Sequence, residues 1–140
     1  MAATDLNTVR STIEARLATE LASSPAIPVV FSNQAFDSTG NASFVQCEVS
    51  FGSGEITSQG NQTNANTLIV GLLTLNVFTE QGIGSGGNLT ICKRLRDLYN
   101  NITVSNVIFD SPIGPEVLAS SPEGKFQTQI RITFEIYEDL

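Results

Sequence analysis

Apolar residues in the N-terminal segment recur at three- and four-residue steps. The series is Leu6, Val9, Ile13, Leu17 and Leu21. This spacing puts all five side chains on one side of a helix. Thr4 or Asp5 can cap the start of that helix, and Pro25 blocks its continuation. The pattern predicts a helix over residues 5–22.

Three later segments predict the main strands. Residues 45–51 alternate apolar with polar side chains, which indicates a half-buried strand. Residues 67–78 are apolar at both phases in their first half, so we expect both faces to be covered there, and they alternate afterwards. In the last strand, residues 126–137, the expected inward residues are Phe126, Ile130, Ile132, Phe134 and Ile136, and the outward ones are Gln127, Gln129, Arg131 and Glu135.

Shorter signals complete the expected fold. A glycine-rich turn at residues 82–87 precedes a second helix ending near residue 100, whose apolar stripe is Ile91, Leu95, Leu98 and Ile102, with Cys92 and Tyr99 beside it. Residues 104–109 are predicted as a strand, and residues 28–31 as an edge strand because prolines lie nearby. The order α-β-β-β-α-β-β predicts an α+β fold, with one mostly antiparallel or mixed sheet of about five strands and two helices packed on it. We expect one domain over residues 1–140.

Two long segments, residues 52–66 and 110–124, are expected to be loops. Loops of this length in a compact domain usually have a function. The interface candidates are Glu55, Ile56 and Gln59 in the first loop, and Ile113, Glu116, Val117 and Leu118 in the second. Exposed aliphatic residues often mark an interface; the alternative is that the second loop folds back on its own core.

The charge balance argues against a free nucleic-acid binder. Seven basic residues stand against fourteen acidic ones, for a net charge of −7, whereas affinity for phosphates comes largely from Lys and Arg. Lys93, Arg94 and Arg96 form a basic cluster, which we interpret as the solvated face of the second helix. Only 15% of the residues are charged, and a subunit held in an assembly tolerates such a surface.

The sequence also predicts where the protein is made. Residues 1–12 lack the features of a secretion signal, and the longest apolar stretch, residues 68–73, is far too short to span a bilayer. We therefore expect synthesis in a cytoplasm and no membrane partner. Cys47 and Cys92 are expected to be reduced and packed in the core. Asn88 begins one of four glycosylation-type triplets, which we interpret as accidental.

No catalytic, metal-binding or cofactor-binding residues are predicted. Histidine is absent, which removes the commonest general base and most zinc sites, and the carboxylates are scattered. Gly82, Gly84 and Gly87 match a dinucleotide-binding pattern, but Glu80 would place negative charge beside the phosphates and too little chain follows for a second nucleotide-binding half. A small nucleotide-binding domain using this turn is the less favoured alternative to a structural protein.

Across its whole length the chain resembles the tail-terminator-like minor tail proteins of tailed phages. The matching segments, in order, are residues 13–21, residues 27–33 followed by Phe36, residues 71–82 continuing to residues 95–98, the Pro112/Pro115 segment, and residues 129–136. The most recognisable part is a strand ending in Val77-Phe78, then a short polar turn, a glycine-rich stretch and a helix.

This resemblance implies a structural virion protein of the tail or neck, assembled in the host cytoplasm. Such a protein forms a homo-oligomeric ring, usually a hexamer, which caps the tail tube, ends its polymerisation and provides the joining surface for the head. The implied partners are further copies of the chain, the tail tube protein and the head-side connector or stopper, with the tail sheath as a further candidate. DNA is implied only as passing cargo. Another head–tail connector protein is the alternative within the same class.

Overall fold

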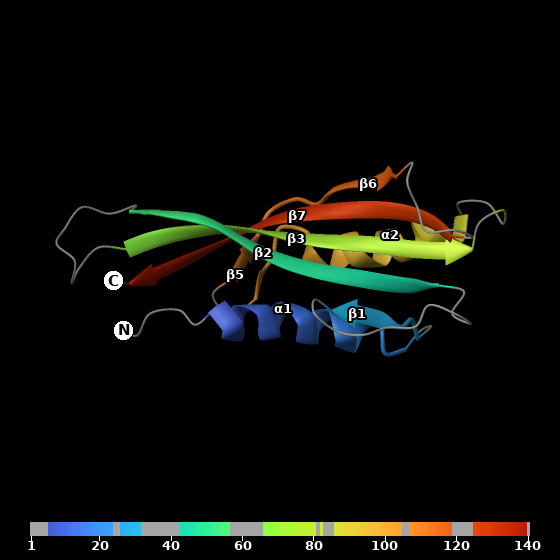
Figure 1. Ribbon diagram of the computed structural model, residues 1–140. Coiled ribbons are helices and arrows are strands. Elements are labelled where there is room, and N and C mark those ends of the chain that lie inside the picture. The colour runs from blue at the N-terminus through green and yellow to red at the C-terminus, as the bar shows by residue number, and fades with distance from the viewer. Residues whose placement is uncertain are drawn as a thin grey trace.

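The computed structural model describes residues 6–23, 26–31, 43–56, 66–80, 82, 86–104, 107–118 and 125–139, with the backbone alone at 53–56, 66–68 and 137–139. Two helices and seven strands lie in these ranges (Figure 1). The elements are α1 (Leu6–Glu20), β1 (Val29–Phe31), β2 (Phe44–Ile56), β3 (Asn66–Glu80), α2 (Gly86–Tyr99), β4 (Thr103–Val104), β5 (Val107–Phe109), β6 (Ile113–Val117) and β7 (Lys125–Asp139).

The strands form one mixed sheet in the order β1-β2-β3-β7-β5-β4, and β6 also pairs with β7. The β1–β2 pair is parallel and all the others are antiparallel. The predicted α+β class, with two helices on a mixed sheet, is confirmed. The described residues contain seven strands, whereas about five were expected. The sequence did not separate β4 from β5 and did not indicate β6, because these strands are short.

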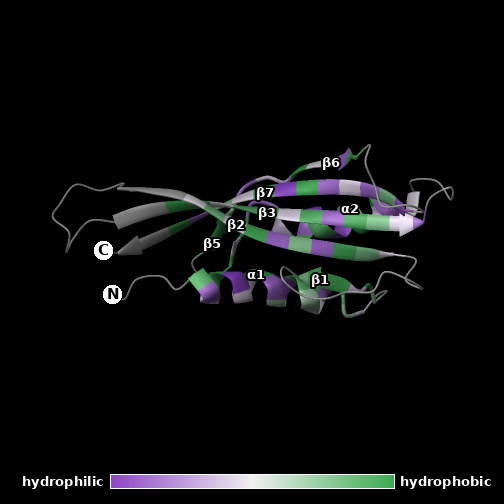
Figure 2. Ribbon diagram, viewed as in Figure 1, coloured by the Kyte–Doolittle hydropathy of each residue, from purple (hydrophilic) through white to green (hydrophobic). Residues whose placement is uncertain are grey.

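The core lies between the two helices and one face of the central strands. Val9, Ile13 and Leu17 of α1 and Ile91 and Leu95 of α2 are buried against the sheet. The Tyr99 hydroxyl at the end of α2 donates a hydrogen bond of 2.8 Å to the backbone carbonyl of Ile13, which joins the two helices inside the core. Figure 2 shows the matching alternation of hydrophobic and hydrophilic residues along the strands.

The three central strands are much longer than the helices that cover them. β3 and β7 have 15 residues each and pair along their whole length, which corresponds to about 50 Å at ~3.3 Å per residue. α1 also has 15 residues but is only about 22 Å long. One end of the β2–β3–β7 ribbon therefore extends beyond the start of α1 (Figure 1).

Two predicted loops are partly strands. Residues 52–56 continue β2 and pair with β3 after an irregularity between Phe51 and Gly54, so the expected loop over 52–66 is too long at both ends. Ile113–Val117, inside the expected loop over 110–124, forms β6 on the edge of β7. In both places pairing with a long neighbouring strand overrides the low strand propensity of Gly and Pro.

Other sequence predictions on the strands also need correction. The expected strand at 104–109 is two short strands, β4 and β5, which pair with each other. The first half of β3 is not covered on both faces, because Val70 is 36% exposed; both faces are covered instead in its second half, at Leu75, Asn76 and Val77. Gln127, expected to face out, is buried, because it hydrogen-bonds to Asn76 on the neighbouring strand.

Gly71 on β3 has a clear packing role. A Cβ atom there would lie 2.2 Å from a ring carbon of Phe134, which pairs with Gly71 across the sheet. The missing side chain thus makes room for a buried aromatic ring that also contacts Phe51 edge-on and Phe109. None of the helices in the described ranges is long and apolar enough to cross a membrane.

Candidate interaction surfaces

The predicted interface residues of the second loop lie together on β6 and directly after it. Ile113 and Val117 are 54% and 64% exposed, which is unusual for aliphatic side chains on a paired strand. Glu116 is also exposed, and the following residue, Leu118, is half-buried. We call these four residues the β6 surface. The structure therefore brings the second set of predicted residues to one edge of the sheet.

The β6 surface is held firmly from two sides. Its backbone pairs with β7, and the amide of Leu118 donates to the carbonyl of Gln127 at 3.0 Å. Arg131 of β7 forms an ion pair with Glu116, and Arg96 of α2 donates to the carbonyl of Gly114. The exposed aliphatic side chains are thus presented on a fixed backbone, so the alternative that this segment folds back into the core does not hold for Ile113 and Val117.

The predicted residues of the first loop lie elsewhere. Glu55 and Ile56 belong to the far end of β2, paired with Leu68 and Thr67 of β3; their side chains, and Gln59 as a whole, lie outside the described residues. Thr67 pairs in turn with Glu138 of β7, seven residues beyond Arg131, or roughly 23 Å along the strand. The structure does not bring the two predicted sets together.

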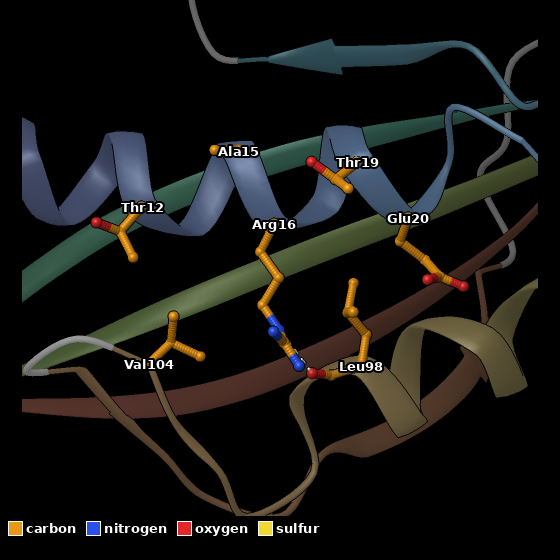
Figure 3. A pocket seen from close by; sticks show the side chains of 7 residues that line it. All are labelled: Thr12, Ala15, Arg16, Thr19, Glu20, Leu98 and Val104. Carbon is orange, nitrogen blue, oxygen red and sulfur yellow. Dashed lines mark hydrogen bonds between the residues drawn. The ribbon is translucent and has the colours of Figure 1, made fainter.

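A groove that the sequence did not predict runs between α1 and the end of α2. It is open, has a volume of about 620 Å³ and is shown in Figure 3. We call it the α1–α2 groove; it is lined by Thr12, Ala15, Arg16, Thr19, Glu20, Leu98 and Val104. The α1 members recur at three- and four-residue steps, so they form one stripe of the helix, about 12 Å long at 1.5 Å per residue.

Two arginines join the C-terminal ends of the helices. Arg16 of α1 donates from Nε to the carbonyl of Leu98, near the end of α2, at 3.0 Å. Arg94 of α2 donates from Nη2 to the carbonyls of Glu20 and Ser23, at the end of α1, at 2.7 and 3.0 Å. The last carbonyls of a helix lack partners within it and carry partial negative charge. Each helix therefore caps the other.

This arrangement corrects the prediction that the basic cluster on α2 is a solvated face. Lys93 fits that prediction, because it is exposed and pairs with Asp97 at 2.7 Å. The Arg94 side chain is only 17% exposed and forms a second contact with the Glu20 carboxylate at 3.3 Å, and Arg96 reaches β6. Nothing local in the sequence indicates these partners, which lie 18 or more residues away.

Arg16 has spare hydrogen-bonding capacity. A guanidinium has five N–H donors, and in the part of the chain that the structure describes Arg16 makes one hydrogen bond, from Nε. It also forms no ion pair with a carboxylate there, unlike Arg10, Lys93, Arg94 and Arg131. The terminal nitrogens of Arg16 are therefore available to a partner that enters the α1–α2 groove.

The sheet face away from the helices carries a row of amides. The Asn76 side chain donates to Gln46 at 3.3 Å and accepts from Gln127 and Gln129 at 3.1 Å each. Asn76 and Gln127 are buried although neither of the two described helices covers this face. The row satisfies four amides across three strands, which fixes the strand register on this face.

A buried polar cluster ties the start of α2 to the sheet. Asn88 donates to the carbonyl of Val77 at 3.1 Å, and its side-chain oxygen accepts from Thr128 at 2.5 Å and from Cys92 at 3.4 Å. Every described buried side-chain N or O atom has a partner. The sequence marked Asn88 only as a glycosylation-type residue, whereas its complete burial indicates a structural role.

Both cysteines are free and buried, which confirms the prediction that they pack in the core. Burial raises the pKa of the Cys47 thiol to about 12, with further increases from the negative charges of Glu14 and Glu48. Burial also raises the pKa of Cys92, partly offset by its hydrogen bond with Thr128. Neither thiol has the lowered pKa of a reactive cysteine.

The glycine-rich turn does not sit in the context of a dinucleotide site. Such a site needs a strand, a helix and a second strand parallel to the first in one βαβ unit. Here β3 is flanked by β2 and β7, both antiparallel to it, and β4, which follows α2, lies three places away in the sheet. Within the described ranges, no three His, Cys, Asp or Glu residues are grouped to hold a metal ion.

Comparison with known proteins gives the fold and no family. No protein-family model matches the chain, and no curated protein matches it. Among solved structures, 24 chains match. One of them, which carries no functional name, has a TM-score of 0.68 and 16% sequence identity, covering 95% of this chain and 96% of its own. The whole arrangement of helices and strands is thus shared, while identity this low shows the fold alone.

Proposed function

We propose that this protein is a structural virion protein that caps the phage tail tube as a homo-oligomeric ring. In this role it ends tube polymerisation and presents the joining surface to the head-side connector. Its partners are further copies of the chain, the tube protein and the connector, with the sheath as a further candidate in a contractile tail. The proposal gives it no catalytic step and no cofactor.

The observation that carries the proposal is the β6 surface. Ile113 and Val117 are more than half exposed on a strand that β7 and α2 hold in place. Covering apolar surface is favourable by about 25 cal/mol per Å², so a fixed aliphatic pair favours a permanent protein partner. The resemblance of residues 13–21, 71–82 and 129–136 to tail-terminator-like proteins indicates which kind of assembly supplies that partner.

The shape of the central ribbon also supports a capping role. A cap needs one surface that fits the last tube ring and a different surface at its other end, so that growth stops after one layer. The β6 surface and the far end of the β2–β3 pair are roughly 23 Å apart along β7, so they can contact different partners. A tenfold preference for the cap over another tube subunit needs only about 1.4 kcal/mol.

Deleting the gene in the phage that encodes this chain tests the proposal. We expect overlong tails of irregular length that do not join filled heads, measured by electron microscopy of lysates. Tails of normal length that join heads would contradict the proposal. Tails of normal length that fail to join would favour the alternative, a head–tail connector protein.

Complementation with variants then tests whether the exposed aliphatic residues of β6 are needed for capping. A plasmid copy with Ile113→Ser and Val117→Ser should leave tails overlong although the purified variant melts like the wild type. The matched control is Leu89→Ser with Leu6→Ser, two exposed aliphatic residues on the helices, which should restore normal tails. Full complementation by the β6 variant would show that assembly does not require the β6 surface.

A further inference from the structure

The α1–α2 groove has the chemistry of a site for an acidic residue beside an aliphatic one. Ala15, Leu98 and Val104 supply apolar wall, and Arg16 lies among them (Figure 3). Terminal guanidinium nitrogens that make no hydrogen bond to the described residues suit a carboxylate, which they bind in a planar, two-bond geometry. Glu20 at the rim is paired with Arg94 at 3.3 Å, so its charge is partly compensated.

The β6 surface of this same chain has the complementary chemistry. Glu116 is exposed, and its side chain shares one face of the sheet with the exposed side chain of Ile113, because their partners on β7 are Gln129 and Arg131. Its carboxylate contacts Arg131 through one oxygen, Oε1. A carboxylate has about four acceptor positions on two oxygens, so Glu116 can accept from a second arginine without losing the first.

We propose that β6 of one copy docks in the α1–α2 groove of the next copy, with Glu116 bound by Arg16. This inference rests on the proposed ring and names its subunit interface. A single molecule cannot make the contact with itself, because β6 and α1 lie on opposite sides of the molecule (Figure 1). The contact joins two different surfaces, and such head-to-tail contacts close into rings when the rotation between copies allows it.

Charge reversal tests the contact because each variant keeps one working surface. Arg16→Glu retains β6, and Glu116→Arg retains the groove. By sedimentation, each variant alone should self-associate at least ~10-fold more weakly than the wild type, a loss of about 1.4 kcal/mol. A 1:1 mixture of the two should regain much of the wild-type association, since one contact is unchanged and the other joins the two reversed charges, which are again opposite.

The control variants separate this contact from general charge effects. Arg10→Glu changes another α1 arginine outside the groove, and Glu135→Arg changes another acid of the sheet; both should self-associate like the wild type. Wild-type behaviour of Arg16→Glu and Glu116→Arg, with rings still visible by electron microscopy, would overturn the inference and leave the proposed ring standing. A wild-type chain that never self-associates, free or on purified tails, would overturn both.

A cross-linking measurement keeps the inference testable even if charge reversal weakens folding. Thr19→Cys places a thiol in the groove, and Ile113→Cys places one on β6, on the same face of the sheet as Glu116. Mixed and oxidised with copper phenanthroline, these two variants should form a disulfide-linked dimer. Ala18→Cys, at the exposed neighbouring position on α1 that does not line the groove, should not cross-link to Ile113→Cys. Cross-linking of both α1 variants to the same extent, or of neither, contradicts the docking.

Discussion

The two faces of the β2–β3–β7 ribbon share a backbone and differ in almost everything else. One row on the helix side joins Cys47, Leu75 and Ile130, all buried and apolar except for one thiol. One residue along, the opposite row joins Gln46, Asn76 and Gln129, which are connected by side-chain hydrogen bonds. The helix side is closed by packing, and the opposite side by this amide row together with the stacked, buried rings of Phe44 and Phe78.

The difference shows how one chain can be both rigid and available for contacts. Apolar burial is non-directional and proportional to area, so the helix side supplies most of the stability. The amide row adds less free energy, but its geometry specifies which strand residues face each other. A sheet secured from one side can keep its other side and its β6 edge open to partners.

The largest expected effect comes from the helix side. Ile130→Ala removes a fully buried side chain and leaves a cavity, which should lower the free energy of unfolding by about 2–5 kcal/mol. Chemical denaturation of the purified chain measures this. A loss below about 1 kcal/mol would show that the helix side is loosely packed, contrary to the comparison of the two faces.

The thiol of Cys47 reports the same difference through pH. Its pKa is about 12 in the folded chain and 9.0 as the ordinary value. Above pH 9 the unfolded chain releases this proton while the folded chain keeps it. The contribution of Cys47 to the free energy of unfolding is therefore fully present below pH 9. It falls by about 1.4 kcal/mol per pH unit between pH 9 and about pH 12. Denaturation between about pH 8 and pH 11 tests the slope, with Cys47→Ala as the variant in which that contribution is absent.

Thiol reactivity compares the two faces of the sheet directly, because a cysteine can be introduced on the face opposite to Cys47. In the native chain at about pH 8, just below the ordinary pKa of a thiol, iodoacetamide should modify neither buried cysteine. Glu48→Cys places a third thiol at an exposed position on the opposite face, and mass spectrometry should then find one modification. Rapid native modification of Cys47 would show that the helix side opens easily.

A smaller effect is expected from the amide row. Asn76→Ala removes the partner of Gln46, Gln127 and Gln129 together, and leaving the buried Gln127 amide unpaired should cost about 1–3 kcal/mol. Asn76→Asp keeps the acceptor for Gln127 and Gln129 but loses the donor to Gln46, so it should destabilise through that one contact and through a buried charge. An unchanged free energy of unfolding in Asn76→Ala would mean that water replaces the hydrogen bonds of the amide row.

The smallest effect should come from the exposed ion pair at β6. Arg131 and Glu116 are both substantially exposed, so Arg131→Ala should change stability by no more than about 1 kcal/mol, and less in high salt. A loss above about 2 kcal/mol would show that β6 depends on this pair and not mainly on its pairing with β7. Thermal unfolding at low and high salt distinguishes the two.

Long, regular patterns in the sequence predicted their elements well. The spacing of Leu6 to Leu21 predicted α1 to within two residues at each end, and the alternation of residues 126–137 lies entirely within β7. The two long strands pair with each other throughout, so local pattern and tertiary pairing agree. In residues 52–56 and 113–117 the two conflict. Glycine and proline there indicate loops, but pairing with a long neighbouring strand makes both segments strands.

The interaction surfaces were predictable only in part. Ile113, Glu116, Val117 and Leu118 could be chosen because aliphatic residues in an expected loop are conspicuous. The α1–α2 groove could not, since Arg16 resembles any solvated helix arginine until Leu98 is placed beside it. Asn88 was missed for the same reason: its partners Val77 and Thr128 lie on two strands that only the fold brings together.

The copy number per particle tests the central claim most directly. The proposed function assigns the chain to a tailed phage, and tails purified from that phage should be treated with an amine-independent, carboxylate-directed cross-linker, because the chain has fourteen acidic residues and only seven basic ones. Detection with an antibody to this chain should then give a ladder of species that ends at the closed ring, a hexamer on the proposed function. A single copy in each particle, with no higher species at any cross-linker concentration, would contradict the proposed ring.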